Sequence, residues 1–167
     1  MAWSNTAPEL PSGSAWEQEK SVSGRANHWS LAGKLYIARL KGRQFAIKAE
    51  LTSGNGSYGT YYPPEKWTLR CDIGDITGTE NTSFAVSKGT TTFYFVGEAG
   101  EGLNITVTVG GVSAAFAPKT ATFVAPALLG STLYFKVGGT WKQATLYRKG
   151  GTWKNALAKF KAGGTWK

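Results

Sequence analysis

The sequence predicts an all-β protein in which an antiparallel β-sandwich or jelly-roll-like domain is followed by a small module of three repeated β-hairpins. Three observations lead to this prediction. Apolar and polar residues alternate with a period of two over many short segments, as in strands with one buried face. Glycine-rich turn signals separate these segments. A five-residue motif then occurs three times in the last third of the chain.

These patterns divide the chain into three parts. Residues 1–26 lack periodicity and contain Pro8 and Pro11, so we expect an extended N-terminal arm. Residues 27–130 carry the alternating segments and form the predicted β-sandwich domain. Residues 131–167 hold the repeats and form the predicted basic hairpin module.

The alternation is clearest in residues 45–51. Phe45, Ile47, Ala49 and Leu51 are expected to point to one face, and Lys48 and Glu50 to the other. Residues 67–73 alternate in the same way, which places Cys71 in the core. No segment has a convincing helical period. Further short strands are expected at residues 35–40, 84–86, 91–96, 103–109, 112–116 and 120–124.

Turn signals mark the ends of these strands. We expect a turn at Lys41-Gly42 and a flexible loop over residues 53–57, because both are rich in residues that favour turns. In residues 103–109 the period of two assigns four apolar residues to the inner face: Leu103, Ile105, Val107 and Val109.

The repeat is the most specific feature of the sequence. The copies begin at Phe135, Tyr147 and Phe160, and each ends in Gly-Gly-Thr-Trp-Lys. A Gly-Gly pair between strand-forming residues favours a two-residue hairpin turn, because the turns that match the twist of the strands require positive φ.

Counting outward from such a turn predicts the cross-strand partners. In every copy a cation faces an indole, a pair that contributes about 0.5–1 kcal/mol at an exposed site. An isolated hairpin is marginally stable in water, so we expect the hairpins to pack on each other, on the sandwich or on other chains. The candidate interface therefore consists of three predicted pairs: Lys136 with Trp141, Arg148 with Trp153, and Lys161 with Trp166.

The net charge of +9 comes entirely from the C-terminal part of the chain. Residues 1–101 carry ten basic and ten acidic side chains, whereas residues 102–167 carry nine basic side chains and no acidic one. We expect such a segment to favour anionic partners, which include nucleic acid, acidic glycans, lipid headgroups and acidic protein surfaces. Its charge could equally serve solubility and meet acidic groups of a neighbouring subunit.

An aromatic residue followed by Lys-x-Gly-Gly-Thr-Trp-Lys, repeated at the C-terminus, resembles the tails of many virion proteins of tailed bacteriophages, among them tail-tip, fibre and accessory proteins. The resemblance covers residues 131–167. It implies a structural protein of the virion, made in the host cytoplasm, that contacts other virion proteins and forms a homo-oligomer, a trimer or larger ring. The second copy departs from the pattern, since Arg148-Lys149 precedes its glycine pair.

Two other functions remain open from the sequence. A carbohydrate- or host-surface-binding module would stack exposed rings on sugars, and its candidate residues lie in and after the glycine-rich loop: Tyr58, Tyr61, Tyr62 and Trp67. Isolated tryptophans of the arm, Trp3 and Trp16, are candidate anchors on another surface or on the same domain. Nucleic-acid binding by the basic, aromatic C-terminus is the second alternative. It is disfavoured because the predicted pairs already occupy those rings.

The sequence predicts no catalytic, cofactor-binding or metal site, and we do not expect an enzyme. Cys71 is the only cysteine and His28 the only histidine, and neither lies in the context of a catalytic group. The carboxylate and amide side chains of Asp72, Asp75, Glu80 and Asn81 match no standard metal loop and are expected to be solvated. Neither a signal-peptide pattern nor an apolar run of membrane-spanning length occurs in the sequence.

Overall fold

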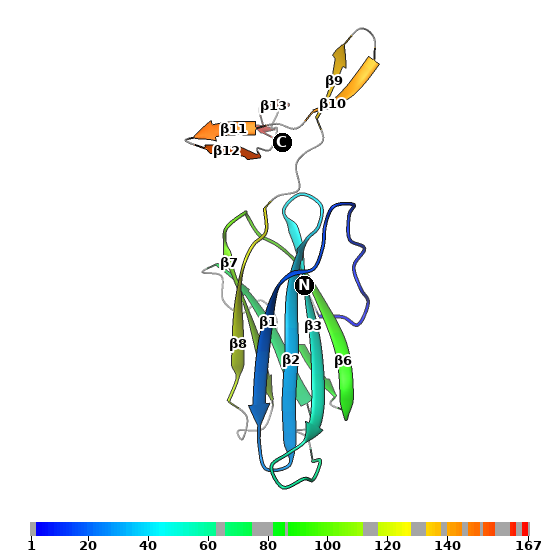
Figure 1. Ribbon diagram of the computed structural model, residues 1–167, viewed down its shortest axis with the longest axis vertical. Coiled ribbons are helices and arrows are strands. Elements are labelled where there is room, and N and C mark those ends of the chain that lie inside the picture. The colour runs from blue at the N-terminus through cyan, green and yellow to red at the C-terminus, as the bar shows by residue number, and fades with distance from the viewer. Residues whose placement is uncertain are drawn as a thin grey trace. The chain divides into compact units, whose positions relative to one another are not determined.

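The computed structural model of the protein is all-β, with no helix among the residues it describes (Figure 1). The chain divides into two compact units, Met1–Ala127 and Leu128–Lys167, close to the boundary expected from the sequence. The described residues are 3–62, 66–74, 82–85, 87–111, 117–127, 133–137, 140–144, 147–150, 152–155, 161–162 and 165–166.

The first unit contains two four-stranded antiparallel sheets, in agreement with the predicted β-sandwich. The first sheet has the order β1-β2-β3-β6 and the second the order β5-β4-β7-β8. The strands of the first sheet are β1 (Glu17–Arg25), β2 (Trp29–Arg39), β3 (Gln44–Asn55) and β6 (Gly89–Glu98). Those of the second sheet are β4 (Lys66–Ile73), β5 (Thr82–Ala85), β7 (Asn104–Gly111) and β8 (Lys119–Val124).

The core is formed by the inward-facing residues that the period of two predicts. The largest fully buried side chains among them are at most 1% exposed, and burying a large apolar side chain contributes about 1.5–3 kcal/mol relative to leaving it in water. Cys71 is among them, as the sequence predicts. The largest members are Phe45, Phe95, Phe123, Leu35, Ile37, Ile47, Leu69, Ile105, Val107 and Val109.

The predicted turn at Lys41-Gly42 connects β2 to β3. The N–H of Leu40 donates to the carbonyl of Gln44 at 2.8 Å, and the N–H of Gln44 donates to the carbonyl of Lys41 at 3.1 Å. Gly42 has φ of +61°, a conformation that glycine adopts without steric cost. The turn prediction is therefore confirmed.

The assignment of residues 1–26 to an extended arm is wrong for its second half. Residues 17–25 form β1, which pairs with β2 from Lys20 opposite Leu35 to Arg25 opposite Ser30. β1 is an edge strand in which Val22 is the one buried residue, so it carries no alternation of apolar residues that would reveal it. Pairing with β2 overrides its weak local preference.

Two further expectations need correction. Leu103 does not face the core but is 43% exposed, because it lies in the turn before β7 and its N–H donates to the carbonyl of Gly100. β3 continues to Asn55, into the segment expected to be a flexible loop. The strand expected at residues 112–116 lies outside the described residues.

The second unit consists, in its described part, of three separate pairs of antiparallel strands. Its side chains lie outside the described part of the structure. The pairs are β9 (Leu133–Val137) with β10 (Thr140–Ala144), β11 (Tyr147–Gly150) with β12 (Thr152–Asn155), and β13 (Lys161–Ala162) with β14 (Thr165–Trp166).

Candidate binding surfaces

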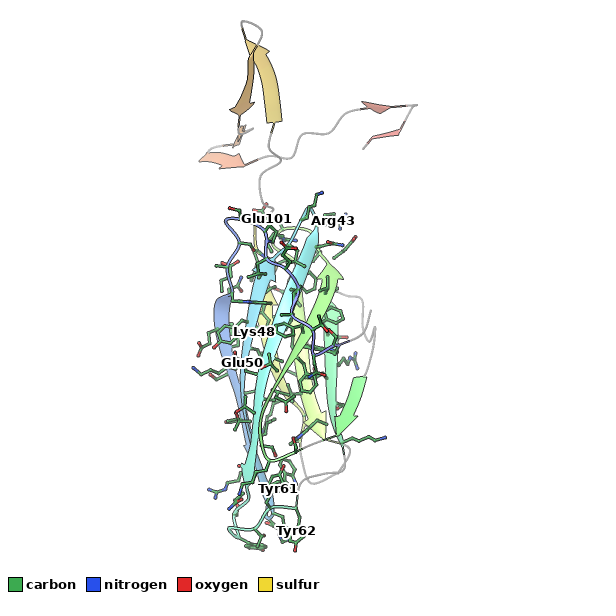
Figure 2. The ribbon with its side chains drawn as sticks, turned by 90° about the vertical axis from the view of Figure 1, so that its right-hand side faces the viewer. Arg43, Lys48, Glu50, Tyr61, Tyr62 and Glu101 are labelled. Atoms are coloured by element: carbon green, nitrogen blue, oxygen red, sulfur yellow. The ribbon has the colours of Figure 1, made fainter. Side chains whose placement is uncertain are left out.

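The two ends of the sandwich differ in chemistry. At one end, which we call the exit end, the chain leaves the first unit through Pro126 and Ala127. At the other end the β1–β2 connection, residues 26–28, meets the loop of residues 56–62 that follows β3. Figure 2 shows Arg43 and Glu101 at the exit end and Tyr62 at the opposite end.

Three rings gather at the end opposite the exit, and we call His28, Tyr58 and Tyr62 the aromatic tip. The centroid of the His28 ring lies 5.5 Å from that of Tyr58 and 5.6 Å from that of Tyr62. Both contacts are edge-to-face, with interplanar angles of 71° and 87°. Tyr58 is 66% and Tyr62 is 70% exposed, so much of each tyrosine ring faces solvent.

Backbone hydrogen bonds hold the aromatic tip in place. The N–H groups of Ser57 and Tyr58 donate to the carbonyls of Ala26 and Asn27, each at 2.9 Å. The N–H of Tyr62 donates to the carbonyl of His28, also at 2.9 Å. The loop is thus attached to the β1–β2 connection along its length. Rings fixed in this way lose little conformational entropy when a ligand binds.

Side chains add to this support. His28 Nδ1 lies 2.9 Å from Thr60 Oγ1, which fixes the orientation of the imidazole ring. Asn55 Nδ2 donates to the carbonyl of Gly59 at 3.0 Å. Gly56 allows the two segments to approach, because a Cβ at this position would lie 2.2 Å from the backbone N of Trp29.

An open depression of about 390 Å³ adjoins the tip, at the end of β1, β2 and β3. It is lined by Ser23, Gly24, Arg25, Ser30 and Asn55. Arg25 connects it to the tyrosine loop, because its Nη2 donates to the carbonyl of Gly56 at 3.1 Å. The lining offers hydroxyl, amide and guanidinium groups, all of which form hydrogen bonds with polar ligands.

The same end of the sandwich carries basic side chains. Lys88 Nζ lies 5.8 Å from the centroid of the Tyr61 ring, and Lys66 at the start of β4 is exposed. The described segments that meet here, residues 23–30, 53–62 and 87–90, contain no carboxylate side chain. Glu65 lies outside the described residues. The described part of this end therefore has a positive charge.

Only part of the predicted ligand loop is available at this surface. Tyr58 and Tyr62 are exposed, whereas Tyr61 is half-buried and its hydroxyl donates to Ser53 Oγ at 3.2 Å. The prediction that Trp67 belongs to a ligand surface is wrong, because Trp67 is 2% exposed and packs edge-to-face on Trp29, with ring centroids 5.0 Å apart. Its place in the alternation of β4 already pointed to the core.

Sequence reasoning missed His28 and Arg25 as members of this surface. The sequence shows no partner for His28, and Arg25 lies in the segment expected to be an arm. One sequence signal points to His28 and Arg25. Both lie in the short polar stretch between Val22 and Trp29, and such a stretch between two apolar residues is typical of a hairpin connection.

Both candidate arm anchors dock on the protein's own first sheet. Trp3 is 6% exposed and lies 5.5 Å from Phe95, and the adjacent Ser4 exchanges two backbone hydrogen bonds with Tyr94 of β6. Trp16 lies 6.0 Å from the Tyr94 ring, and Lys48 Nζ lies 5.5 Å from the Trp16 centroid. The arm therefore covers part of the open edge formed by β6.

The outer face of the first sheet carries a network of charges next to Trp16. Lys48 Nζ lies 4.2 Å from the centroid of the Tyr36 ring and 3.1 Å from Glu50 Oε1. Glu19 and Lys34 form an ion pair of 3.1 Å. The hydrogen bond between them lowers the pKa of Glu19 and raises the pKa of Lys34.

The repeat residues can be compared with their predicted partners at the level of the backbone. Lys136 lies opposite Trp141 in the pair of β9 and β10, and Lys161 lies opposite Trp166 in the pair of β13 and β14. Both registers agree with the predicted partners. The contacts of cations with rings stay predictions, because these side chains lie outside the described residues.

The register predicted for the second copy is wrong by one residue. Arg148 lies opposite Lys154, and Lys149 takes the place opposite Trp153. The physical reason lies in the sequence of this copy, where two adjacent cations precede the glycine pair. Because either one can face the indole, the sequence does not discriminate between the two registers.

Within the described residues, no group of three His, Cys, Asp or Glu side chains could hold a metal ion. Asp72 forms an ion pair of 2.9 Å with Arg70, while Asp75, Glu80 and Asn81 lie outside the described part. The described residues also include no helix that is long and apolar enough to span a membrane.

Comparison with known proteins provides no relative for this chain: no family model, curated protein or solved structure matches it.

Proposed function

We propose that this protein is a structural component of a bacteriophage virion, in the tail, a fibre or an accessory position, and that it acts through protein–protein contacts. The observation that carries the proposal is the threefold Gly-Gly-Thr-Trp-Lys repeat. The resemblance of this repeat to the tails of phage virion proteins supplies the class of protein. The basic charge of residues 102–167 supplies a means of contact with acidic partners.

The small size of the strand pairs supports a role in assembly. β13 and β14 have two residues each, and β11 and β12 have four. Two-stranded pairs of this length are not stable in water without further packing. Contacts with other copies or other virion proteins would supply the missing buried area. We therefore propose a homo-oligomer, a trimer or larger ring, whose repeats contribute to the subunit contacts.

Mass spectrometry of purified phage particles tests the location. The particles come from the phage whose genome encodes the chain, and they are washed in high salt to remove adsorbed basic proteins. We expect peptides of the first unit, such as those spanning β2 and β3, at a constant ratio to the major capsid protein. Their absence from washed particles, with the protein present in the lysate, would contradict the proposal.

A further inference from the structure

We infer that the aromatic tip, together with Arg25 and the depression beside it, is a binding site for an acidic oligosaccharide. This inference goes beyond the structural role proposed above and does not depend on it. It rests on the geometry of one end of the sandwich, where solvent-facing rings, hydrogen-bonding side chains and basic charge occur together.

The rings supply the first part of the site. Tyr58 and Tyr62 are 66% and 70% exposed, yet both pack against His28 and belong to a loop fixed by backbone hydrogen bonds. Large aromatic side chains held rigidly in water offer contact area at a low entropic cost. The faces of sugar rings carry C–H groups, which pack against the electron-rich face of an aromatic ring. The tip therefore suits a saccharide.

The depression supplies the second part. Ser23, Ser30 and Asn55 present hydroxyl and amide groups, and Arg25 adds a guanidinium with several donors. Its volume of about 390 Å³ lies in the range of small-ligand sites, about 300–1,000 Å³. Sugar hydroxyl groups both donate and accept, so a lining of this mixed character matches them.

The charge of the tip indicates an acidic saccharide rather than a neutral one. Arg25, Lys66 and Lys88 lie at this end, and the described segments that form it hold no carboxylate side chain. A carboxylate or sulfate on the sugar would interact favourably with this charge, and the attraction would weaken as salt is added.

Single-stranded nucleic acid is also anionic and also stacks on rings, but the geometry favours a saccharide. Proteins that bind single strands use a basic groove with successive aromatic side chains along it. Here the two exposed tyrosines lie on one short loop, around one histidine. The neighbouring depression is lined by neutral hydroxyl and amide groups apart from Arg25.

Titration calorimetry on the full chain tests the inference. The probes are hexasaccharides bearing carboxylate or sulfate groups (oligogalacturonate, oligosialate and a heparin fragment), a neutral dextran hexasaccharide, and a twelve-residue oligothymidylate. We expect at least one acidic hexasaccharide to bind more tightly than dextran and oligothymidylate. Its affinity should fall at least about tenfold in the double variant Tyr58→Ala/Tyr62→Ala.

Two further double variants test whether binding depends on the charge at the tip or on basic charge elsewhere in the protein. Lys66→Ala/Lys88→Ala and Lys41→Ala/Arg43→Ala remove the same charge from opposite ends of the sandwich, and all four residues are exposed. The first double variant should weaken binding severalfold, whereas the second should leave it unchanged. The inference would be overturned if no acidic hexasaccharide bound, or if the tyrosine variant kept the natural affinity. It would also be overturned if the two lysine and arginine pairs had equal effects, or if the protein preferred oligothymidylate in a way that depends on the tip.

Discussion

The guanidinium of Arg39 donates a hydrogen bond from Nε to the carbonyl oxygen of Pro126, at 3.0 Å, and so ties β2 to the segment by which the chain leaves the sandwich. Its Nη1 donates to the carbonyls of Arg43 and Ala99, at 2.9 and 3.0 Å. Arg39 is 2% exposed, and burial lowers the pKa of its guanidinium. Backbone carbonyls therefore solvate this charge in the protein interior.

Replacing Arg39 should destabilise the first unit. Arg39→Leu leaves the buried carbonyls of Pro126 and Ala99 without this donor, and we expect the free energy of unfolding to fall by about 2–4 kcal/mol. Urea denaturation followed by tryptophan fluorescence measures the change. Arg43→Ala is the matched control, because the Arg43 side chain is exposed and only its backbone carbonyl takes part. A loss below about 0.5 kcal/mol in Arg39→Leu would contradict this role.

The two tryptophans of the arm should contribute unequally to stability. Trp3→Ala removes a buried ring that packs on Phe95, and we expect a loss of about 3–5 kcal/mol. Trp16→Ala removes a half-buried ring with a cation–π contact, for which about 0.5–1 kcal/mol is expected. Thermal unfolding monitored by circular dichroism checks the order. The reverse order would show that the contact with Phe95 does not stabilise the arm.

Cys71 should make stability depend on alkaline pH. Burial raises the pKa of its thiol to about 12. In the unfolded chain the thiol titrates near its ordinary value of 9.0, so above that pH the unfolded state loses the proton first. Between these two values the unfolding free energy should fall by about 1.4 kcal/mol per pH unit from this group, and no such loss occurs below pH 9.

The comparison variant for this prediction is Cys71→Ala, which is less stable at neutral pH but has no thiol to titrate. Urea denaturation at several pH values should give a steeper alkaline decline for the natural protein than for Cys71→Ala. All other titratable groups are the same in both proteins, so the difference between the two slopes isolates the thiol. Equal slopes would contradict the buried, protonated state.

Gly56 should be required for the geometry of the aromatic tip. A Cβ in Gly56→Ala would lie 2.2 Å from the backbone N of Trp29 and 2.5 Å from the carbonyl oxygen of Asn27, so the loop must move. We expect faster amide hydrogen exchange at Tyr58 and Tyr62, whose N–H groups are bonded across this approach. Gly100→Ala is the control, since its nearest atom would lie 3.7 Å away. Unchanged exchange in Gly56→Ala would contradict the close approach.

Much of the sandwich could be predicted from the sequence because the period of two reports directly on burial. Leu69, Ile105 and Val107 alternate with polar neighbours, and all three are fully buried. β1 could not be predicted in this way, because an edge strand with one buried residue has no such period. Long-range pairing determines its position.

The candidate site was only partly predictable for a related reason. The sequence places Tyr58 and Tyr62 in a glycine-rich loop, but it does not show that this loop packs against the β1–β2 connection. His28 and Arg25 belong to the site only because β1, β2 and β3 are adjacent in the first sheet. Trp67 lies close in sequence to the tyrosines, but its place in the alternation of β4 directs it into the core.

Light scattering coupled to size-exclusion chromatography is the most direct test of the proposal that the repeats hold subunits together. We expect the natural chain of 17.9 kDa to elute with the mass of a trimer or larger ring. The triple variant Trp141→Ala/Trp153→Ala/Trp166→Ala should shift toward the monomer while the first unit keeps its unfolding temperature. A natural protein that remains monomeric at all concentrations, or an oligomer that the triple substitution leaves intact, would contradict the proposal.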